Sequence, residues 1–269
     1  MACRFTFFRE PSNSFLNKLL DNQDRESLLP NHAAAGFTDP IKGNASGPNP
    51  PPPPTGFSER TVRVYLGEGR ETYEAACGAL LSWRMHEEST WSRIVLSRKK
   101  RTDLKVNMVT VAKACCGLVW SINPCVVLYE RKHTKVMSDD SASPPPRSST
   151  VHQQCWDQHQ ATQAKRLWAG SSPKTAPKWA AFPPCGGTPG RTGTQSAVAY
   201  TTLKGHLIQG EERMRVAHFG GPQGDGPVWF EVYSVSRGSG LVGGLLFPLL
   251  RPMQASFFRE QADTVRRIV

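Results

Sequence analysis

The 269-residue sequence contains no Cys-x-x-Cys pair and no even set of cysteines. Its seven cysteines are scattered along the chain, at positions 3, 77, 115, 116, 125, 155 and 185. A disulfide framework is typical of short secreted chains with an even number of cysteines. We therefore expect free thiols in a reducing compartment, several of them serving as small buried hydrophobic residues.

Long hydrophobic runs are also missing. The longest apolar stretch covers ten residues, 241–250, which is too short to cross a bilayer, so no membrane span is predicted. The N-terminus lacks the uninterrupted apolar run of a signal peptide, and acidic residues such as Glu10 and Asp21 are atypical of organelle transit peptides. By default we expect a cytoplasmic protein.

Two cofactor motifs are incomplete. "GEGRET" at 67–72 follows a predicted strand, but it has threonine where a dinucleotide-binding loop needs its third glycine, so it is interpreted as a turn. His152, Cys155 and His159 could supply three zinc ligands, yet a fourth ligand at Cys185 gives no standard spacing. The sequence therefore predicts no cofactor and no metal site.

Hydrophobic residues make up only 38% of the chain, which also contains 22 prolines and 23 glycines. Residues 38–56, with five consecutive prolines, and residues 137–193 have compositions that cannot bury enough surface to fold. We predict an N-terminal helix and a Pro-rich disordered linker over 1–56, one α+β domain formed by 57–136 and 196–269, and a disordered insertion over 137–195.

Positive charge is in excess, since 33 Lys and Arg against 22 Asp and Glu give a net charge of +11. Such a charge favours contact with nucleic acid, anionic membranes or acidic partners. The basic residues gather at 97–105 and 130–135, however, without the interleaved aromatic residues that stack on bases. We therefore interpret these stretches as solvated hairpin ends rather than as a nucleic-acid-binding surface. Binding to nucleic acid would need Arg98–Arg101 to share a face with Arg131 and Lys132.

The remaining sequence alternates between strand and helix patterns. "TVRVYLG" at 61–67 predicts a strand, and apolar residues at helical spacing over 73–84 predict an amphipathic helix. Further strands are predicted at 91–97, 104–113, 125–130, 196–205, 212–219 and 227–236; the last is expected to be half-buried.

From Leu241 onward the pattern is helical again and places Leu246, Leu250, Met253 and Phe257 on one side, with a break or kink expected at Pro248 and Pro252. The order of elements predicts an α+β fold, in which a curved antiparallel sheet carries an N-terminal-half helix and a C-terminal helix. A cavity between such a sheet and the terminal helix is a site for a hydrophobic ligand, although the same layout also describes solid cores.

"AYTTLKGHLIQGEERM" at 199–214 combines a histidine with two adjacent carboxylates. His206 and either Glu211 or Glu212 could act as a general base with an orienting carboxylate. A hairpin connection over 205–210, with a structural or ligand-contacting role for the polar residues, is the favoured interpretation. Because strand side chains alternate, Glu211 and Glu212 face opposite sides, so at most one of them points inward.

Five segments carry a family resemblance: "YLGEGRETYEAACGALLSWRMH", "INPCVVLY", "AYTTLKGHLIQGEERM", "GPVWFEVYSVS" and "FPLLRPMQ". In this order they resemble the plant and bacterial family called domain of unknown function 1990 (DUF1990), also known as uncharacterised protein family UPF0548; "REPSNSFLNKLL" resembles its N-terminal helix. The chain departs from the family pattern at residues 137–193, at Thr201 in place of glycine, and at Pro252.

The resemblance implies no established activity. The family's order of strands and helices is similar to helix-grip domains of the START and Bet v 1 type, which hold apolar molecules under a C-terminal helix. We therefore predict a soluble module that binds a small apolar molecule or lipid; the sequence does not indicate its oligomeric state. The predicted ligand-binding residues are Trp83, His86, Tyr200, His206, Glu211, Arg251 and Gln254.

An enzyme is the alternative function. It would need His86 or His206 to meet a carboxylate within hydrogen-bonding reach, directly or through one water molecule. No catalytic residue is assigned from the sequence.

Overall fold

A computed structural model describes residues 4–21, 29–33, 35–39, 53–86, 92–97, 107–114, 118–137, 192–220 and 224–269. Its elements in chain order are β1 (Arg4–Phe7), α1 (Asn13–Asp21), β2 (Ser58–Glu68), α2 (Gly69–Leu81), η3 (Arg84–His86), β3 (Ser92–Leu96), β4 (Asn107–Ala114), β5 (Val119–Met137), β6 (Thr192–Thr202), β7 (Ile208–His218), β8 (Pro227–Gly238) and α4 (Gly240–Ile268). The fold is α+β.

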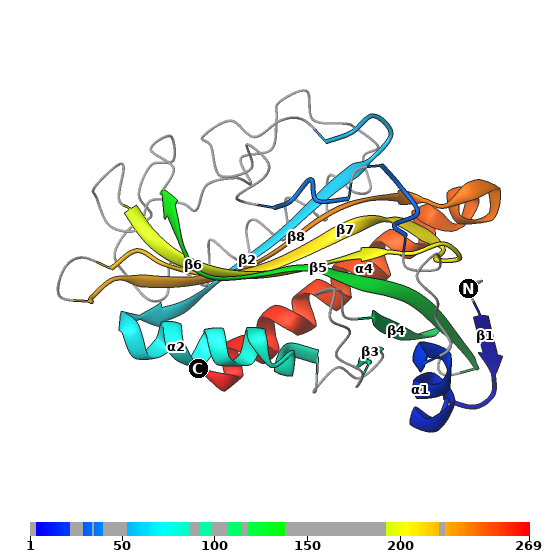
Figure 1. Ribbon diagram of the computed structural model, residues 1–269, viewed down its shortest axis with the longest axis horizontal. Coiled ribbons are helices and arrows are strands. Elements are labelled where there is room, and N and C mark those ends of the chain that lie inside the picture. Colours follow the sequence, from blue (N-terminus) through cyan, green and yellow to red (C-terminus); the bar gives the residue numbers. More distant parts are fainter. Residues whose placement is uncertain are drawn as a thin grey trace.

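The eight strands form one antiparallel sheet with the order β2-β8-β7-β6-β5-β4-β3 (Figure 1), and β1 pairs with β5 outside this path. The long strand β5 joins the two ends of the sheet. Its first part pairs with β4 and β1, and its later part pairs with β6, from Cys125 opposite Thr202 to Met137 opposite Thr192. Strands from both sides of the segment 138–191 therefore hydrogen-bond directly to each other.

The helices α2 and α4 lie on the same side of the sheet (Figure 1) and pack on the main hydrophobic core. From the sheet this core takes alternate residues of several strands, such as Val228, Phe230 and Val232 of β8. The helices supply the matching apolar stripes, including Leu80 of α2 and Phe258 of α4. The short helix α1 covers the other end of the sheet, where its leucines pack against β4 and β5.

The opposite face of β8 is also buried, so the predicted half-buried strand is wrong. Glu231 and Tyr233 have no exposed surface, and Trp229 is also buried. Residues 35–39 contribute to this cover: Thr38 bonds to Tyr129 of β5 and Glu211 of β7. The alternation in the sequence correctly separated apolar from polar residues, but it could not show that the N-terminal segment packs on the polar face.

Helix α4 continues from Gly240 to Ile268 through Pro248 and Pro252, so the break allowed for in the sequence analysis does not occur. Each proline removes one backbone hydrogen bond. The second half of the helix packs against the sheet, where Phe258, Ala262 and Val265 are fully buried. These contacts stabilise the helix despite the lost hydrogen bonds.

Candidate functional site

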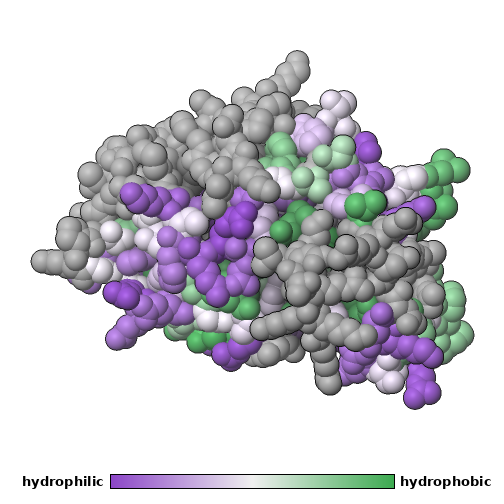
Figure 2. All heavy atoms as spheres, viewed as in Figure 1, coloured by the Kyte–Doolittle hydropathy of each residue, from purple (hydrophilic) through white to green (hydrophobic). Residues whose placement is uncertain are grey.

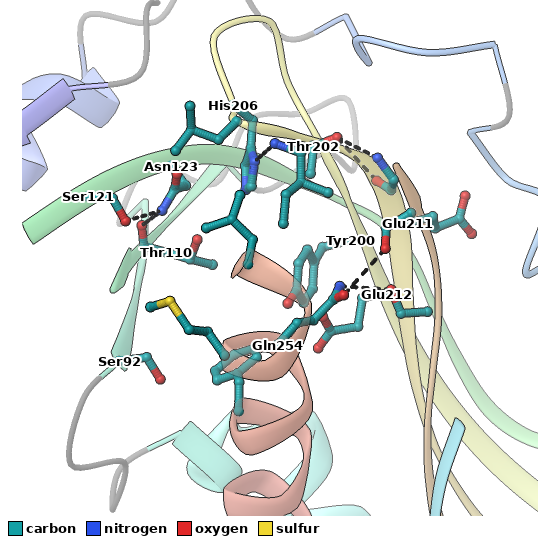
Figure 3. Close-up of a pocket in the computed structure, with 18 of the residues that line it drawn as sticks. Ser92, Thr110, Ser121, Asn123, Tyr200, Thr202, His206, Glu211, Glu212 and Gln254 are labelled. Carbon is teal, nitrogen blue, oxygen red and sulfur yellow. Dashed lines mark hydrogen bonds between the residues drawn. The ribbon is translucent and has the colours of Figure 1, made fainter. Parts of the chain in front are cut away.

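A cavity of about 130 Å³ lies between α4 and the sheet (Figure 3). The helix contributes Leu250, Met253 and Phe257, which are three of the four residues that the sequence pattern placed on one side. The full lining consists of Ser92, Thr110, Val111, Ser121, Asn123, Tyr200, Thr202, His206, Leu207, Ile208, Gly210, Glu211, Glu212, Ser234, Ser236, Leu250, Met253, Gln254 and Phe257. Most of the exposed wall area is apolar, although twelve of the nineteen lining residues have polar side chains, which can orient a ligand.

Glu212 is the acidic group on the helix-facing side of this wall. It lies on β7 on the same face as Met214 and Val216, and only 6% of its surface is exposed. Gln261 of α4 donates a hydrogen bond from Nε2 to Glu212 Oε1 at 3.0 Å, and the Tyr200 hydroxyl also hydrogen-bonds to this carboxylate. Sheet and helix thus meet through a polar contact beside the cavity.

Burial raises the pKa of Glu212 from 4.5 to about 7, because desolvation outweighs the hydrogen bonds from Gln261 and Tyr200 that oppose it. The pKa of Tyr200 is raised well above 10, first by burial and then by the charge of Glu212. The Glu212 carboxyl can therefore donate or accept a proton near neutral pH.

Glu211, the predicted ligand-binding carboxylate, contributes to the cavity lining but directs its carboxylate to the other face of the sheet. There it accepts hydrogen bonds from the backbone N–H of Gly36 and from the N–H and hydroxyl of Thr38. The alternation argument that only one of the two glutamates points inward is confirmed, and the inward one is Glu212. Its spacing from Met214 and Val216 was the signal that could have identified it.

His86 is buried and His206 is half-buried, and desolvation lowers the pKa of each to about 3. His206 lines the cavity, and its Nδ1 accepts a hydrogen bond from the Ile208 N–H at 2.9 Å, within the β6–β7 turn. His86 lies outside the lining and stacks between Trp83 and Phe257, with ring centroids 5.9 and 5.5 Å away. Both rings are neutral at pH 7, and the hydrogen bonds of Glu211 go to residues 36–38 rather than to a histidine.

Of the three other predicted ligand-binding residues, only Gln254 lines the cavity. It bonds to two serines of β8, donating to Ser234 Oγ at 3.2 Å and meeting Ser236 Oγ at 3.3 Å. Trp83 is not part of the lining; its ring centroid lies 6.3 Å from that of Tyr200, which is part of it. Arg251 is also outside the lining, with its guanidinium 5.9 Å from the Phe247 ring centroid. The structure thus brings Tyr200, His206, Glu211 and Gln254 together at one cavity, with the Glu211 carboxylate bonded to Gly36 and Thr38.

The sequence profile of the family described as "domain of unknown function (DUF1990)" matches residues 42–168 and 178–264. The chain belongs to the DUF1990 family. A curated relative, the UPF0548 protein At2g17695 of Arabidopsis thaliana, is 23% identical over 214 residues, which cover 80% of this chain and 74% of the relative. Every residue that lines the cavity lies within the ranges matched by the DUF1990 profile.

Two solved structures show weaker similarity. One is an uncharacterised protein from Rhizobium leguminosarum, with 9% identity, a TM-score of 0.30, and coverage of 79% of this chain and 93% of the other. The other is the ZhuI aromatase/cyclase from Streptomyces sp. R1128, with 11% identity, a TM-score of 0.30, and coverage of 79% and 95%. At this TM-score neither similarity bears on the fold or the function of this DUF1990 protein.

Helix α4 is the one helix among the described residues that has the length and composition of a membrane span. The apolar window of α4 that passes this test is only 17% buried, so most of it lies outside the core, although the second half of the helix packs in the core. A single helix of this kind is weak evidence for a span.

Several interpretations from the sequence fall outside the described residues. They concern the basic run Arg98–Arg101, the pair Cys115 and Cys116, the His152 motif, and most of the segments predicted to be disordered. Of the second basic stretch, Arg131 pairs with Asp39 at 2.7 Å and Lys132 with Glu130 at 2.9 Å. Within the described part of the chain, no three His, Cys, Asp or Glu residues are placed to hold a metal ion.

Proposed function

We propose that this DUF1990 protein binds a small, largely apolar molecule in the cavity between α4 and the sheet. In this proposal the fold is of the helix-grip type, with the sheet wrapping the long C-terminal helix. The observation that carries the proposal is the cavity itself: apolar residues from α4 and from the β6–β7 turn face each other across it, and Tyr200 and Glu212 stand at its wall. This combination is typical of small-molecule sites.

The volume of the cavity restricts the ligand. Sites for drug-sized molecules usually measure about 300–1,000 Å³, and an engineered apolar cavity of about 150 Å³ in another protein binds benzene. A cavity of about 130 Å³ therefore fits a single ring or a short chain rather than a whole lipid. Within this space, Glu212 and Tyr200 would hydrogen-bond to a polar atom on the ligand and set its orientation.

Two neighbouring leucines allow a matched test. Leu250 lines the cavity, whereas Leu249 is 70% exposed and is not part of the lining. Leu250→Trp should fill the cavity and lower the affinity for indole, phenol or benzene by about tenfold or more, while Leu249→Trp should leave it unchanged. Saturation-transfer NMR on the purified protein measures the binding. The proposal is wrong if the wild-type protein binds none of these probes, or if both variants bind them equally well.

An acid–base enzyme is the second candidate, and the raised pKa of Glu212 is the observation that favours it. Here Glu212 would exchange a proton with a molecule held in the same cavity, in place of the predicted pair of histidine and Glu211. Native mass spectrometry of wild-type protein and of Glu212→Gln tests this idea. An enzyme predicts that the variant retains an unconverted molecule that the wild-type protein releases as product; the same bound molecule in both proteins indicates binding alone.

A further inference from the structure

Large hydrophobic side chains are exposed mainly in two places. The first half of α4 exposes Leu241, Val242, Leu245 and Leu249, by 90%, 63%, 79% and 70%; we call these residues the α4 ridge. The segment around β1 exposes Phe5, Phe7, Phe8 and Leu118, by 45%, 62%, 82% and 53%; we call these the β1 ridge. Groups of exposed large apolar side chains of this kind mark a contact with another molecule or a membrane.

The α4 ridge occupies one side of its helix. At about 100° per residue its four positions fall within an arc of about 100°. The cavity residues Leu250, Met253 and Phe257 lie on another side of the same helix. The first half of α4 therefore faces the cavity with one side and exposes the α4 ridge on another side. The turn before β7 is bonded to the start of α4, because the Ser239 N–H donates to the Leu207 carbonyl at 2.9 Å.

The two ridges lie at the same end of the long axis of the molecule, far from the C-terminus (Figure 1), and hydrophobic surface is visible at that end (Figure 2). Phe8 projects from a backbone with a φ of 61°, a conformation that non-glycine residues rarely adopt. The exposure of this large ring on strained backbone is a feature that folding alone does not explain.

Positive charge predominates around the ridges, although the exposed Glu10 follows Arg9 and pairs with Arg93 at 3.0 Å. No acidic residue occurs between Glu231 and Glu260, a stretch that contains the whole α4 ridge. Lys204 is exposed on the turn that contacts the start of α4, and Arg9 is exposed directly after Phe8. The chain as a whole carries a net charge of +11. Apolar side chains flanked by Lys and Arg are the combination that binds an anionic lipid surface.

From these observations we propose that the α4 and β1 ridges form a docking surface for an anionic lipid bilayer. The protein lies on the membrane through this end and does not span it. Two separate protruding ridges suit a bilayer, into which each can insert, better than a protein partner, which needs a continuous complementary surface of about 1,000 Å² or more. The proposal is independent of the cavity function, although it would place the cavity helix at the membrane.

Sedimentation with lipid vesicles tests the proposal. Wild-type protein should bind vesicles of phosphatidylcholine with about 30% phosphatidylserine, bind pure phosphatidylcholine more weakly, and lose binding as salt rises from about 0.1 to 0.5 M. Leu245→Ser combined with Leu249→Ser should weaken binding about tenfold or more, and Phe7→Ser combined with Phe8→Ser should do the same. Val269→Ser, at the exposed C-terminus at the other end of the molecule, should have no effect.

The replaced leucines and phenylalanines are exposed, so circular dichroism should show folded variants. The proposal is overturned if wild-type protein binds neither type of vesicle, or if both double variants bind as the wild type does. A dimer in gel filtration that the leucine variant converts to a monomer, without vesicle binding, would overturn it in favour of a contact between copies. The Leu250→Trp variant, whose cavity is filled, should still bind vesicles. Loss of ligand binding in the cavity can therefore be distinguished from loss of membrane binding.

Discussion

Glu212 is a carboxyl group that the fold keeps away from water and from positive charge. Its hydrogen bonds come from neutral groups, Gln261 and Tyr200, and these do not offset the cost of burying a carboxylate. Glu231, on the other face of the sheet, is also buried, but its pKa is lowered rather than raised. Burial would raise the pKa of Glu231, yet Arg215, Arg63 and Arg213 outweigh burial and lower it to about 2. The neighbouring charges, rather than depth, decide which glutamate can hold a proton at neutral pH.

The pKa of Glu212 makes stability depend on pH. The folded protein holds this proton up to about pH 7, whereas the unfolded chain releases it near pH 4.5, so the free energy of unfolding should fall as pH rises between these values. A shift of this size corresponds to about 3 kcal/mol. In urea unfolding from pH 4.5 to 8, the stability of the wild-type protein relative to Glu212→Gln should fall by this amount.

The two histidines, His86 and His206, change stability in the opposite direction. His86 and His206 have lowered pKa values in the folded state, so their contribution to stability rises with pH up to about 6.5. They are present in both proteins, and the difference between wild type and Glu212→Gln therefore isolates the carboxyl group. Parallel stability profiles for the two proteins would show that Glu212 titrates normally.

Helix α4 is built from two halves with different surroundings. The second half supplies buried residues to the core, while the first half, which begins after Ser239, covers the cavity and leaves its outer side exposed. The start of the helix lies unusually close to the β6–β7 turn. A β-carbon added at Gly243 would lie 2.3 Å from the Leu207 carbonyl oxygen, so only glycine permits this approach. The adjacent Gly244 has no neighbour within 4 Å of such an atom.

These two glycines give a prediction for the helix. Gly243→Ala should lower the free energy of unfolding by about 1–3 kcal/mol, because the turn and the helix must move apart. Gly244→Ala should raise it by about 0.5–1 kcal/mol, because alanine favours helix more than glycine does. Thermal unfolding compares the two variants. A similar effect at both positions would mean that the close contact between the helix and the turn does not form in solution.

The whole sheet separates two kinds of interior. The side facing α2 and α4 is hydrophobic, whereas the other side buries an ion cluster in which Arg63 of β2 and Arg213 and Arg215 of β7 surround Glu231 of β8. Arg213 bonds Glu231 Oε1 at 2.9 Å and also donates to the Thr38 carbonyl at 3.0 Å. This cluster joins three strands to the N-terminal segment.

Removal of the central carboxylate should therefore be costly. Glu231→Gln leaves the fully buried Arg213 and Arg215 and the half-buried Arg63 without their shared counter-ion, and should lower the free energy of unfolding by about 3–5 kcal/mol. Glu74, which pairs with Arg70 at 2.7 Å on the surface of α2, provides the control, since Glu74→Gln should leave stability unchanged within error. Urea unfolding at pH 7 measures both variants. If Glu231→Gln costs no more than Glu74→Gln, the ion cluster does not hold this face together.

The sequence by itself determined the order of α1, α2, α4 and the strands β2 to β8, the α+β class, the family, and the alternation that divides residues such as Glu211 and Glu212 between the two faces; it missed β1 and η3. These properties are local, because the period of apolar residues and the identity of short segments are visible without contacts between distant parts of the chain.

Only the tertiary structure decided which face each alternating set occupies and what covers it. Residues 36–38 bind Glu211, and Gln261 on α4 meets Glu212, at separations of 173 residues or more for Glu211 and 49 for Glu212. Packing of the second half of α4 also keeps the helix continuous through two prolines. Burial and desolvation depend on such distant contacts, so the proton-holding carboxyl, the size of the cavity and the exposed ridges follow from the folded chain.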